Sequence, residues 1–583
     1  MEVKKPNDYL DKRQQLDILE GQLKLERISF DPYWRDLSDY ILPRRSRFYI
    51  TDVNRGERKN ERIVDSTASM AVRTTASGMM TGVTSPARSW FKLQTGDSEL
   101  NDIPEVKSYL KVVTEKMKGV FLKSNLYNIL PTLYADLSTF GTACVYMEED
   151  MDSVVNFTSF PLGSFYIANN HKGRASVFMR EFQMTVRQLV EKFVRLDPDK
   201  PNSMDWDKVT QAVKDQYEKG NFETQIDITH VIRPNPAYRP GSPASKYKRF
   251  ESVYYEKGIS STNQSNVSSS AYPKQFLRVS GYDFFPVMAV RWETAGEDTY
   301  GTNCPGMLAI GDVKQLQLQE KRIAQAIEQK VRPSMIGPTS LKNQKASILP
   351  GDITYLDERE GTRGFRRLYE VDFDVRELEG KHDQIRQRIS RAFYEDLFLM
   401  LANTNRRQIT AREVEERHEE KLLALGPVLE RINQDLLDPL IENTFEIMER
   451  QGMLPEVPEE LAGTEYKIEY VSIMAQAQKL AGIGNIERLL DFTTMAANIN
   501  PEAAQKIDVE EMIEQYADQV GVDSKLIKTK EFMEALRQQQ AEAQAAEQEM
   551  LQAQEMANSA KTLSETKMDE DTALQQLLGG QGV

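Results

Sequence analysis

The sequence contains few of the features that mark secreted, membrane or metal-binding proteins. Its 583 residues include two cysteines, Cys144 and Cys304, too few for a disulfide framework or a zinc cluster, and we expect both to be small core residues. No apolar run approaches the roughly 18 residues that cross a bilayer, and the N-terminal residues lack the apolar stretch of a signal peptide. We therefore expect a cytoplasmic protein without a membrane partner.

Catalytic motifs are missing as well. The chain has no G-x-x-x-x-G-K-[ST] loop and no G-x-G-x-x-G after a strand, so it shows no phosphate cradle for an ATPase. In ITAREVEERHEEKLLALGPVLERI a zinc-protease helix would need H-E-x-x-H, but Leu422 occupies the place of the second histidine. We expect surface or helix-face positions for the four histidines, His171, His230, His382 and His418. No enzyme activity, metal or cofactor is therefore expected.

The charge balance is acidic, with 89 Asp and Glu against 74 Lys and Arg and a formal net charge of -15. This balance argues against a protein that coats nucleic acid through a basic surface, but it allows a local basic patch or DNA passing an acidic wall. Residues 531–583 hold 10 acidic and 3 basic side chains and are rich in Ala, Gln and Glu. Their composition predicts a helix that ends in a disordered tail of about 20 residues.

Residues up to about 305 show the alternating patterns of an α+β region. Apolar spacing predicts two helices over 9–42, broken near Asp31-Pro32, and a third over 63–80. The first helix has its apolar residues at Leu16, Leu19, Leu23 and Ile28. A hairpin is predicted with its turn at Asn169–Gly173, followed by a helix that opens with a capping box of Thr185 and Gln188.

From Gly306 onward the pattern becomes mainly helical. Residues 306–330 and 375–400 each carry an apolar stripe on one face, which predicts two long amphipathic helices around a small α/β insert. A polar loop follows over 401–409, and then a long helix whose apolar stripe is interrupted at Gly426-Pro427. Proline inside a helix costs about 3 kcal/mol, so we expect a kink there, and Pro439 is a candidate for a second bend.

This order of elements is similar to the portal, or head-to-tail connector, of tailed bacteriophages, in the version found in short-tailed phages. The resemblance covers Tyr9 to about Asp523, and its most specific stretch runs from Thr410 to Pro455. The shorter stretches that carry it are ILPRRSRF, GMMTGVTSPARSWFKL, FGTACVYMEED and VRPSMIG.

The resemblance implies an α+β, mainly helical portal fold that assembles as a ring of twelve subunits. The implied parts are a wing (1–305), a first stem helix (306–330), a clip (331–374), a second stem helix (375–400), a tunnel loop (401–409), a kinked helix with a wing strand (410–472), crown helices (473–530) and an acidic C-terminal helix and tail (531–583).

The same resemblance implies a function and partners. The ring would be a channel for double-stranded DNA at one capsid vertex, serving genome packaging, tail attachment and genome ejection without reading the DNA sequence. Implied partners are a separate terminase, tail adaptor proteins, and capsid and scaffolding proteins. The implied location is the virion, after assembly in the host cytoplasm.

Three groups of site residues follow from the resemblance. The tunnel loop would face DNA with Asn403, Thr404, Asn405, Arg406 and Arg407. Its two arginines would either contact phosphate or pair with the carbonyl end of the preceding helix. In the clip, Arg363, Arg366 and Arg367 would either bind a partner or, as we favour, form salt bridges to a neighbouring subunit. The helix kink would lie at Gly426 and Pro427.

Two other classes of function share some of these features. Another virion structural protein, such as a tail tube, adaptor or internal scaffold component, would share the acidity and the lack of catalytic motifs. It is not expected to have paired helices around an insert followed by a proline-kinked helix. A metal-dependent hydrolase is disfavoured by Leu422.

Overall fold

The computed structural model describes most of residues 12–471, together with Met512, Met556 and Asn558. The gaps within 12–471 are 51–55, 57, 98–99, 102, 197–199, 201, 260–275, 333, 337–365, 368–374, 404–424 and 462–465. The chain divides into two compact units, Met1–Gln478 and Lys479–Val583, and all elements below belong to the first. The predicted crown helices and acidic tail lie outside the described residues, as does most of the clip.

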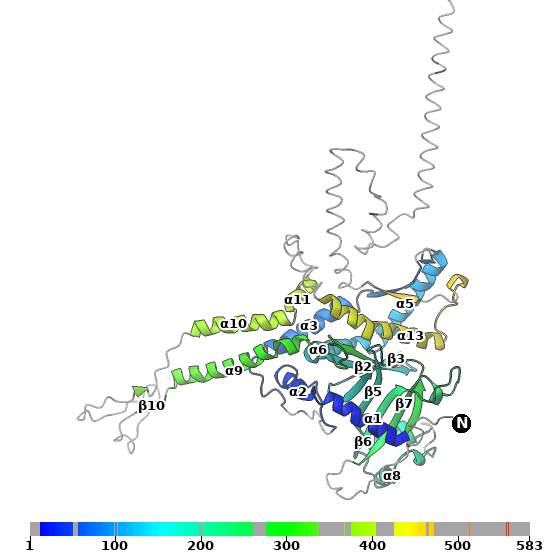
Figure 1. Cartoon of the computed structure of the whole chain (residues 1–583), viewed down its shortest axis with the longest axis horizontal. Helices are drawn as coiled ribbons and strands as arrows, with labels where there is room; N and C mark the ends of the chain where they lie inside the picture. The colour runs from blue at the N-terminus through cyan, green and yellow to red at the C-terminus, as the bar shows by residue number, and fades with distance from the viewer. Residues whose placement is uncertain are drawn as a thin grey trace, which may run out of the picture. The chain divides into compact units, whose positions relative to one another are not determined.

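The first 305 residues form the predicted mixture of helices and strands (Figure 1). The helices are α1 Lys12–Arg27, α2 Asp31–Tyr40, α3 Thr67–Val83, α5 Pro104–Lys123, α6 Leu126–Phe140, α7 Val186–Leu189 with the π-helical η2 Val190–Val194, and α8 Gln211–Glu218. Single 3₁₀ turns are η3 Trp206–Lys208 and η4 Ser245–Tyr247, and a later one is η8 Glu459–Leu461.

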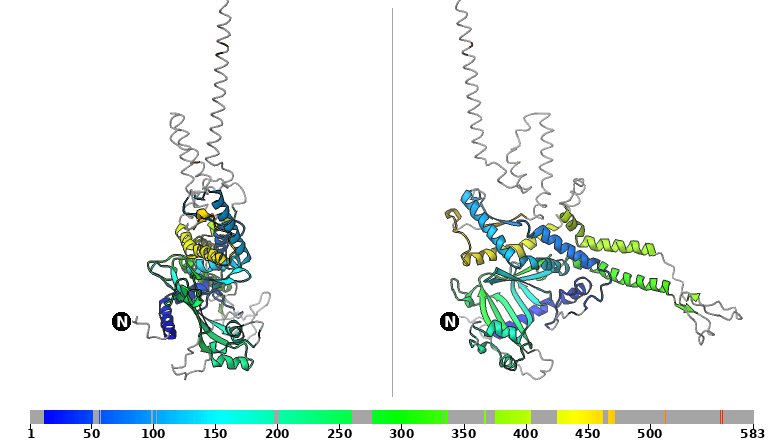
Figure 2. Two further views of the ribbon diagram at one scale, coloured as in Figure 1. Left: turned by 90° about the vertical axis from the view of Figure 1, so that its right-hand side faces the viewer. Right: turned by 180° about the vertical axis from the view of Figure 1, so that it is seen from behind.

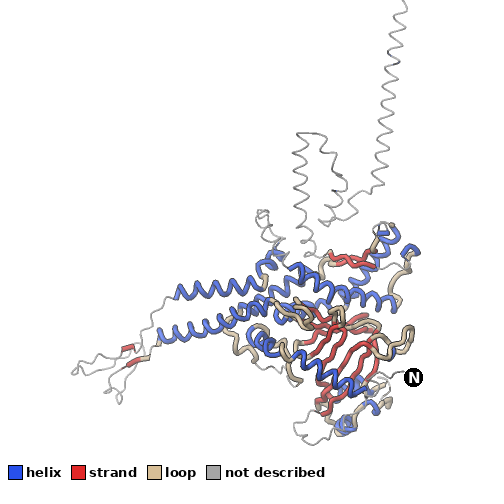
Figure 3. Tube along the Cα trace, in the orientation of Figure 1, coloured by secondary structure: helices blue, strands red, loops and turns tan. Residues whose placement is uncertain are grey.

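The strands form small antiparallel sheets (Figure 3). A five-stranded sheet has the order β4 Phe165–Asn169, β5 Ala175–Thr185, β6 Gln225–Pro234, β7 Phe250–Ile259 and β8 Arg278–Tyr282. A three-stranded sheet has the order β3 Val154–Phe160, β2 Thr142–Asp150 and β9 Val287–Arg291. The predicted hairpin is confirmed as β4–β5, and the predicted capping box is confirmed at Thr185 and Gln188.

The strand expected late in the chain is present. β12 Tyr466–Tyr470 returns to pair antiparallel with β1 Phe91–Thr95, and the side chain of Gln94 donates a hydrogen bond to Glu469, which is 375 residues away in sequence. The main hydrophobic core lies between this region, α3, α5, α6 and the three-stranded sheet, and it includes Cys144 and Cys304, which are buried as predicted. Full burial of a large apolar side chain contributes about 1.5–3 kcal/mol, so this core accounts for much of the fold's stability.

The two long helices lie side by side and extend from the core (Figures 1 and 3). α9 Pro305–Val331 matches the predicted first helix closely. The second predicted helix, 375–400, is instead two helices, α10 Val375–Ala392 and α11 Glu395–Asn403. Tyr394 breaks it with a left-handed backbone (φ 56°). Residues 401–403 therefore belong to α11 and not to the predicted loop.

In the chain segment that connects α9 to α10, β10 Met335–Ile336 pairs antiparallel with β11 Arg366–Arg367. After the gap at 404–424, residues 425–432 are helical and continue as the π-helical η7 Asn433–Leu437 and α13 Asp438–Arg450. The wide π turn stands directly before Pro439, whose missing N–H cannot close an ordinary α turn, so the helix is irregular at the second predicted bend. The first bend depends on residues before 425, which lie outside the described residues.

Several sequence predictions need correction. The first helix pair breaks at residues 28–30, and Asp31-Pro32 opens α2 because proline is tolerated in a first helical turn. α3 begins at Thr67 and not at Ile63, and α5 was not predicted.

The prediction of surface or helix-face histidines is wrong for His230, which is fully buried in β6. It stacks on Tyr254 with ring centroids 3.7 Å apart, and its Nε2 bonds Ser252 Oγ at 2.9 Å. Burial holds the pKa of His230 well below its usual range, so the core accommodates a neutral ring. His382 lies on a helix as predicted but is only 4% exposed.

Candidate functional site at the base of the paired helices

The paired helices are anchored at one end and exposed at the other. Along α9 the last buried side chains are Val313, Leu316 and Gln317, and no side chain between Leu318 and Val331 is buried. Large aliphatic side chains nevertheless continue along this distal half: Leu318, Ile327 and Val331 are 49%, 42% and 73% exposed. The base of the helices therefore fixes their position, while the distal part leaves apolar surface uncovered.

Gln317 is the polar centre of the base. Its Oε1 accepts hydrogen bonds from the backbone amides of Val64 (2.6 Å) and Asp65 (2.8 Å), and its Nε2 donates to the Asp65 carbonyl (2.7 Å). One side chain from α9 thus satisfies three backbone groups of the segment that leads into α3. Because buried backbone polar groups are costly to leave unpaired, this amide ties the helix pair to the core.

Asp65 extends the contact to α10. Its Oδ1 accepts from the Thr67 amide at 2.8 Å, and its Oδ2 accepts from Arg386 Nε and Nη2 at 3.1 and 3.0 Å. Burial raises the pKa of Asp65, but the hydrogen bonds from Thr67 and the guanidinium of Arg386 outweigh it and hold the pKa below its usual value. The carboxylate therefore stays ionised and bridges α3 to α10.

Ion pairs also join α9 directly to α10. Arg386 Nη2 lies 2.7 Å from Glu320 Oε1, which also lies 3.0 Å from His382 Nδ1. Nearer the core, Arg388 Nη2 lies 2.7 Å from Asp312 Oδ1. Each pair is partly exposed and contributes modestly alone, but together they set the register of the two helices.

The return of the chain to the core depends on close packing between α11 and α3. Thr75 Oγ1 donates to the Phe393 carbonyl at 2.7 Å, at the break between α10 and α11. A Cβ atom on Gly78 would lie 2.4 Å from the Cβ of Phe398, so only glycine fits there without a shift. These contacts fix α11 against α3 at the base of the helix pair.

The paired helices are basic within an acidic chain. Residues 318–331 and 379–392 contain seven basic and four acidic side chains, a net charge of +3, whereas the whole chain carries -15. Among the basic residues, Lys321, Arg322 and Arg391 are exposed. They form no ion pair within the described part of the chain. This arrangement suits weak, repeated contact with a polyanion.

The structure places part of the predicted site residues. Asn403 ends α11, and Thr404 to Arg407 lie outside the described residues. Arg366 and Arg367 form β11 and pair with Ile336 and Met335, while Arg363 lies outside. Gly426 and Pro427 lie in the helical stretch 425–432. These groups come from separate parts of the chain, and no described contact brings them together.

Sequence reasoning missed the residues of the base. Gln317 lies in a helix that was predicted from its apolar stripe alone, and no spacing rule distinguishes a buried glutamine from its exposed neighbours. Asp65 did carry a signal, because Asp-Ser-Thr before an apolar stretch is typical of a helix start. The missing element was the partner, which lies 252 residues away.

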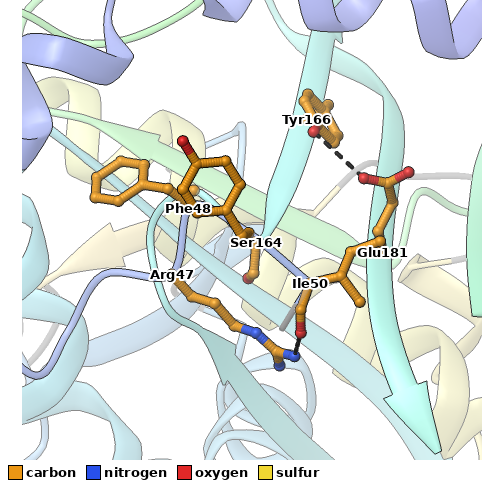
Figure 4. A pocket seen from close by; sticks show the side chains of 8 residues that line it. Arg47, Phe48, Ile50, Ser164, Tyr166 and Glu181 are labelled. Carbon is orange, nitrogen blue, oxygen red and sulfur yellow. Dashed lines mark hydrogen bonds between the residues drawn. The ribbon is translucent and has the colours of Figure 1, made fainter. Parts of the chain in front are cut away.

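A second candidate, a small pocket, carries no binding chemistry. It lies between Arg47–Ile50 and strands β4 and β5 (Figure 4). Arg47 donates to the Ile50 carbonyl, and Tyr166 donates to Glu181, which lies 3.0 Å from Lys24. Its polar groups are thus engaged within the chain.

No helix among the described residues has the length and apolar character to cross a membrane.

Comparison with known proteins gives consistent matches over nearly the whole chain. Residues 13–527 match the family model described as bacteriophage head to tail connecting protein. The chain is 45% identical over 562 residues to the portal protein of Salmonella phage epsilon15, covering 96% of this chain and 97% of that protein. It is 39% identical over 554 residues to the probable portal protein of Bordetella phage BPP-1, covering 95% and 96%.

Proposed function

Because the chain belongs to the family of bacteriophage head to tail connecting proteins, we propose that its copies form a ring in which α9 and α10 surround the DNA channel. As a portal protein it forms the head–tail connector and DNA channel of a phage particle, and its role is structural and not enzymatic. Family membership thus replaces both alternatives raised from the sequence, a different virion structural protein and a metal-dependent hydrolase.

The observation that carries the ring is the uncovered distal half of α9. Leu318, Ile327 and Val331 are 42–73% exposed in one copy. A two-helix projection has no core of its own in which to bury them, so a neighbouring copy is the natural cover. A ring supplies such a neighbour to every copy.

The charge of the helix pair supports its place beside DNA. An acidic chain repels DNA in general, which keeps a translocating duplex from being held tightly. The net charge of +3 on residues 318–331 and 379–392, repeated around a ring, adds local attraction to phosphates. Such contacts carry no sequence information, so any duplex could pass.

The remaining parts are assigned by resemblance. We propose twelve subunits, a short-tailed phage, and a crown formed by residues after 473. Asn403 to Arg407 would contact DNA, because they lie at and directly after the end of α11, which packs on α3 at the base of the helix pair. The segment around Arg363 to Arg367 would contact a neighbouring subunit at the distal end of the helix pair. Terminase, tail adaptors, and capsid and scaffolding proteins would be the partners.

Imaging of the purified full-length protein tests the ring. Negative-stain or cryo-electron microscopy should show closed rings with a central channel, and the top views should give the number of subunits. A stable monomer of 66.7 kDa in light scattering at high concentration would contradict the proposal.

A double substitution tests the DNA-facing loop. Arg406→Ala with Arg407→Ala should leave rings intact but change the amount of DNA packaged or retained in particles. Arg187→Ala with Arg239→Ala, on the wing, is a matched control that removes the same charge. Full-length genomes retained as firmly as in wild type would assign Arg406 and Arg407 to the helix-end role.

A further inference from the structure

Helix α1 turns its charges toward the protein and its aliphatic side chains outward. All seven of its charged residues have a polar partner in the described chain: Lys12, Arg13, Asp17, Glu20, Lys24, Glu26 and Arg27. The two arginines are 4% exposed, and their guanidinium groups lie 3.8 and 4.0 Å from the ring centroids of Tyr255 and Tyr166. The face against the five-stranded sheet is therefore rich in ion pairs, around the buried Leu16 and Leu23.

The opposite face of α1 is uncharged and carries exposed aliphatic side chains beside the exposed Gln14 and Gln22, and Ile28, directly after the helix, extends it. Ile18, Leu25 and Ile28 are 49%, 72% and 64% exposed. Their spacing places them about half a turn away from Leu16 and Leu23, which are buried against the sheet. Helix α1, drawn in dark blue in Figure 2, lies beside the five-stranded sheet and contacts β4. Single exposed aliphatic residues are ordinary, but an aligned set without a free charge marks a surface that binds a partner.

The same kind of surface continues onto α2 and α9. Tyr33 of α2 is 39% exposed, and its hydroxyl donates to the Met307 carbonyl at 3.0 Å. The next residue of α9, Leu308, is 63% exposed. We name Ile18, Leu25, Ile28, Tyr33 and Leu308 the outer apolar face. It ends on the same helix whose distal aliphatic residues are uncovered.

We propose that the outer apolar face is a subunit interface, covered by the neighbouring copy of this chain. The inference rests on the proposed ring and adds to it a contact on the wing. A second copy is the occupant because the face runs onto α9, where the ring is proposed to cover Leu318 and Ile327. A neighbouring copy packed along α9 would lie beside Leu308. The residue before it, Met307, accepts a hydrogen bond from Tyr33 of α2, the helix that follows α1, so the same neighbour would reach α1.

Gly21 gives this face a shape that the single copy does not use. It lies in the middle of α1, is exposed, and a Cβ atom there would meet no atom within 4 Å. Glycine inside a helix is destabilising, and no contact among the described residues requires it here. Between Ile18 and Leu25 it leaves a notch into which a side chain of the neighbouring copy fits.

Thiol labelling tests the occupant directly. In Leu25→Cys the introduced thiol is the reactive one, because Cys144 and Cys304 are buried. Its reaction with a maleimide should be about tenfold slower or more in purified rings than in monomers, a factor that corresponds to about 1.4 kcal/mol of opening. Leu122→Cys on α5, where Leu122 is 60% exposed, is the matched control and should react equally in both.

The outcomes separate this inference from the proposed ring. Equal labelling of Leu25→Cys in rings and monomers would overturn the interface while leaving the ring intact. Protection that arises only in whole particles would also overturn it and assign the face to the capsid. Failure of the wild-type protein to form rings would instead refute the proposed function.

A second variant, Gly21→Leu, tests the interface without the risk that the substitution prevents folding. Gly21→Leu raises helix propensity in α1 and fills the notch, so the monomer should be at least as stable while ring formation weakens. Gly119→Leu on α5 is the control, since Gly119 is also exposed, helical and free of neighbours within 4 Å. Ring formation by Gly21→Leu at the control's level would count against the interface.

Discussion

Gln317 offers the sharpest test of how the helix pair is held. Gln317→Leu keeps the volume of the side chain but removes an acceptor for the amides of Val64 and Asp65 and a donor to the Asp65 carbonyl. A net hydrogen bond contributes about 0.5–1.5 kcal/mol, so three of them give roughly 1.5–4.5 kcal/mol. Because the site is partly buried, we expect a loss of about 2–3 kcal/mol.

Hydrogen exchange measures this loss at the amides concerned. The peptide containing Val64 and Asp65 should exchange faster in Gln317→Leu, by about thirtyfold for 2 kcal/mol. Gln317→Glu keeps the acceptor but loses the donor and adds a charge beside Asp65. Its exchange rate should therefore lie between those of the wild type and Gln317→Leu. Denaturant unfolding of the same variants gives the global effect.

Gln315→Leu is the matched control for this test, because Gln315 is exposed and lies two residues away on the same helix. It should exchange like the wild type over residues 61–67. If Gln317→Leu exchanged no faster than Gln315→Leu, the amide would not hold the junction, and apolar packing of α9 would have to be its anchor.

Three further outcomes follow from the structure. Gly78→Val should destabilise the fold by about 1–3 kcal/mol in denaturant unfolding, because its Cβ would lie 2.4 Å from Phe398, whereas Gly119→Val should show no such clash. The lowered pKa of Asp65 means that its stabilising contribution is complete above about pH 4 and is lost as the pH falls through its folded-state pKa. Asp65→Asn should therefore lose less unfolding free energy than wild type between about pH 5 and pH 3, and equal losses would contradict this assignment. Pro427→Ala should straighten the helix that contains it and displace the preceding loop in ring structures. A loop in its wild-type position would show that Pro427 does not determine where the loop lies.

Local signals were sufficient for much of the architecture. The first long helix and the hairpin with its capping box were predicted from periodicity and turn residues, whereas the late strand β12 was implied only by the family resemblance. Such signals act within a few residues, so the sequence displays them directly. The break at Tyr394 was missed because the apolar stripe continues through it, and a left-handed tyrosine depends on the packing of Phe393 and Phe398 against α3.

The candidate site was less accessible to sequence reasoning. The apolar stripes predicted helices at the positions of α9 and α10, but the contacts that anchor these helices join Asp65 to Gln317 and Arg386, more than 250 residues away. A side chain whose partner is that distant looks like any surface glutamine or arginine. The buried His230 was missed for the same reason, since its hydrogen-bond partner Ser252 lies on the neighbouring strand β7.

The exposed aliphatic residues show why periodicity in one chain cannot predict which apolar side chains are buried within that chain. Periodicity grouped Ile28 with Leu16 and Leu23 as one apolar stripe, but Leu16 and Leu23 are buried while Ile28 is 64% exposed. Six such side chains are 42–73% exposed in one copy: Ile18, Leu25, Ile28, Leu318, Ile327 and Val331. Full burial contributes about 1.5–3 kcal/mol for each, and since roughly half of each surface is already covered, burying the rest would give roughly 5–9 kcal/mol per subunit at most. That gain opposes the entropy lost on association, so in the proposed ring the residues that leave the single copy with uncovered apolar surface would stabilise the contact between copies. Under this proposal, their apolar character is explained by contacts between copies and not by the core of the single chain.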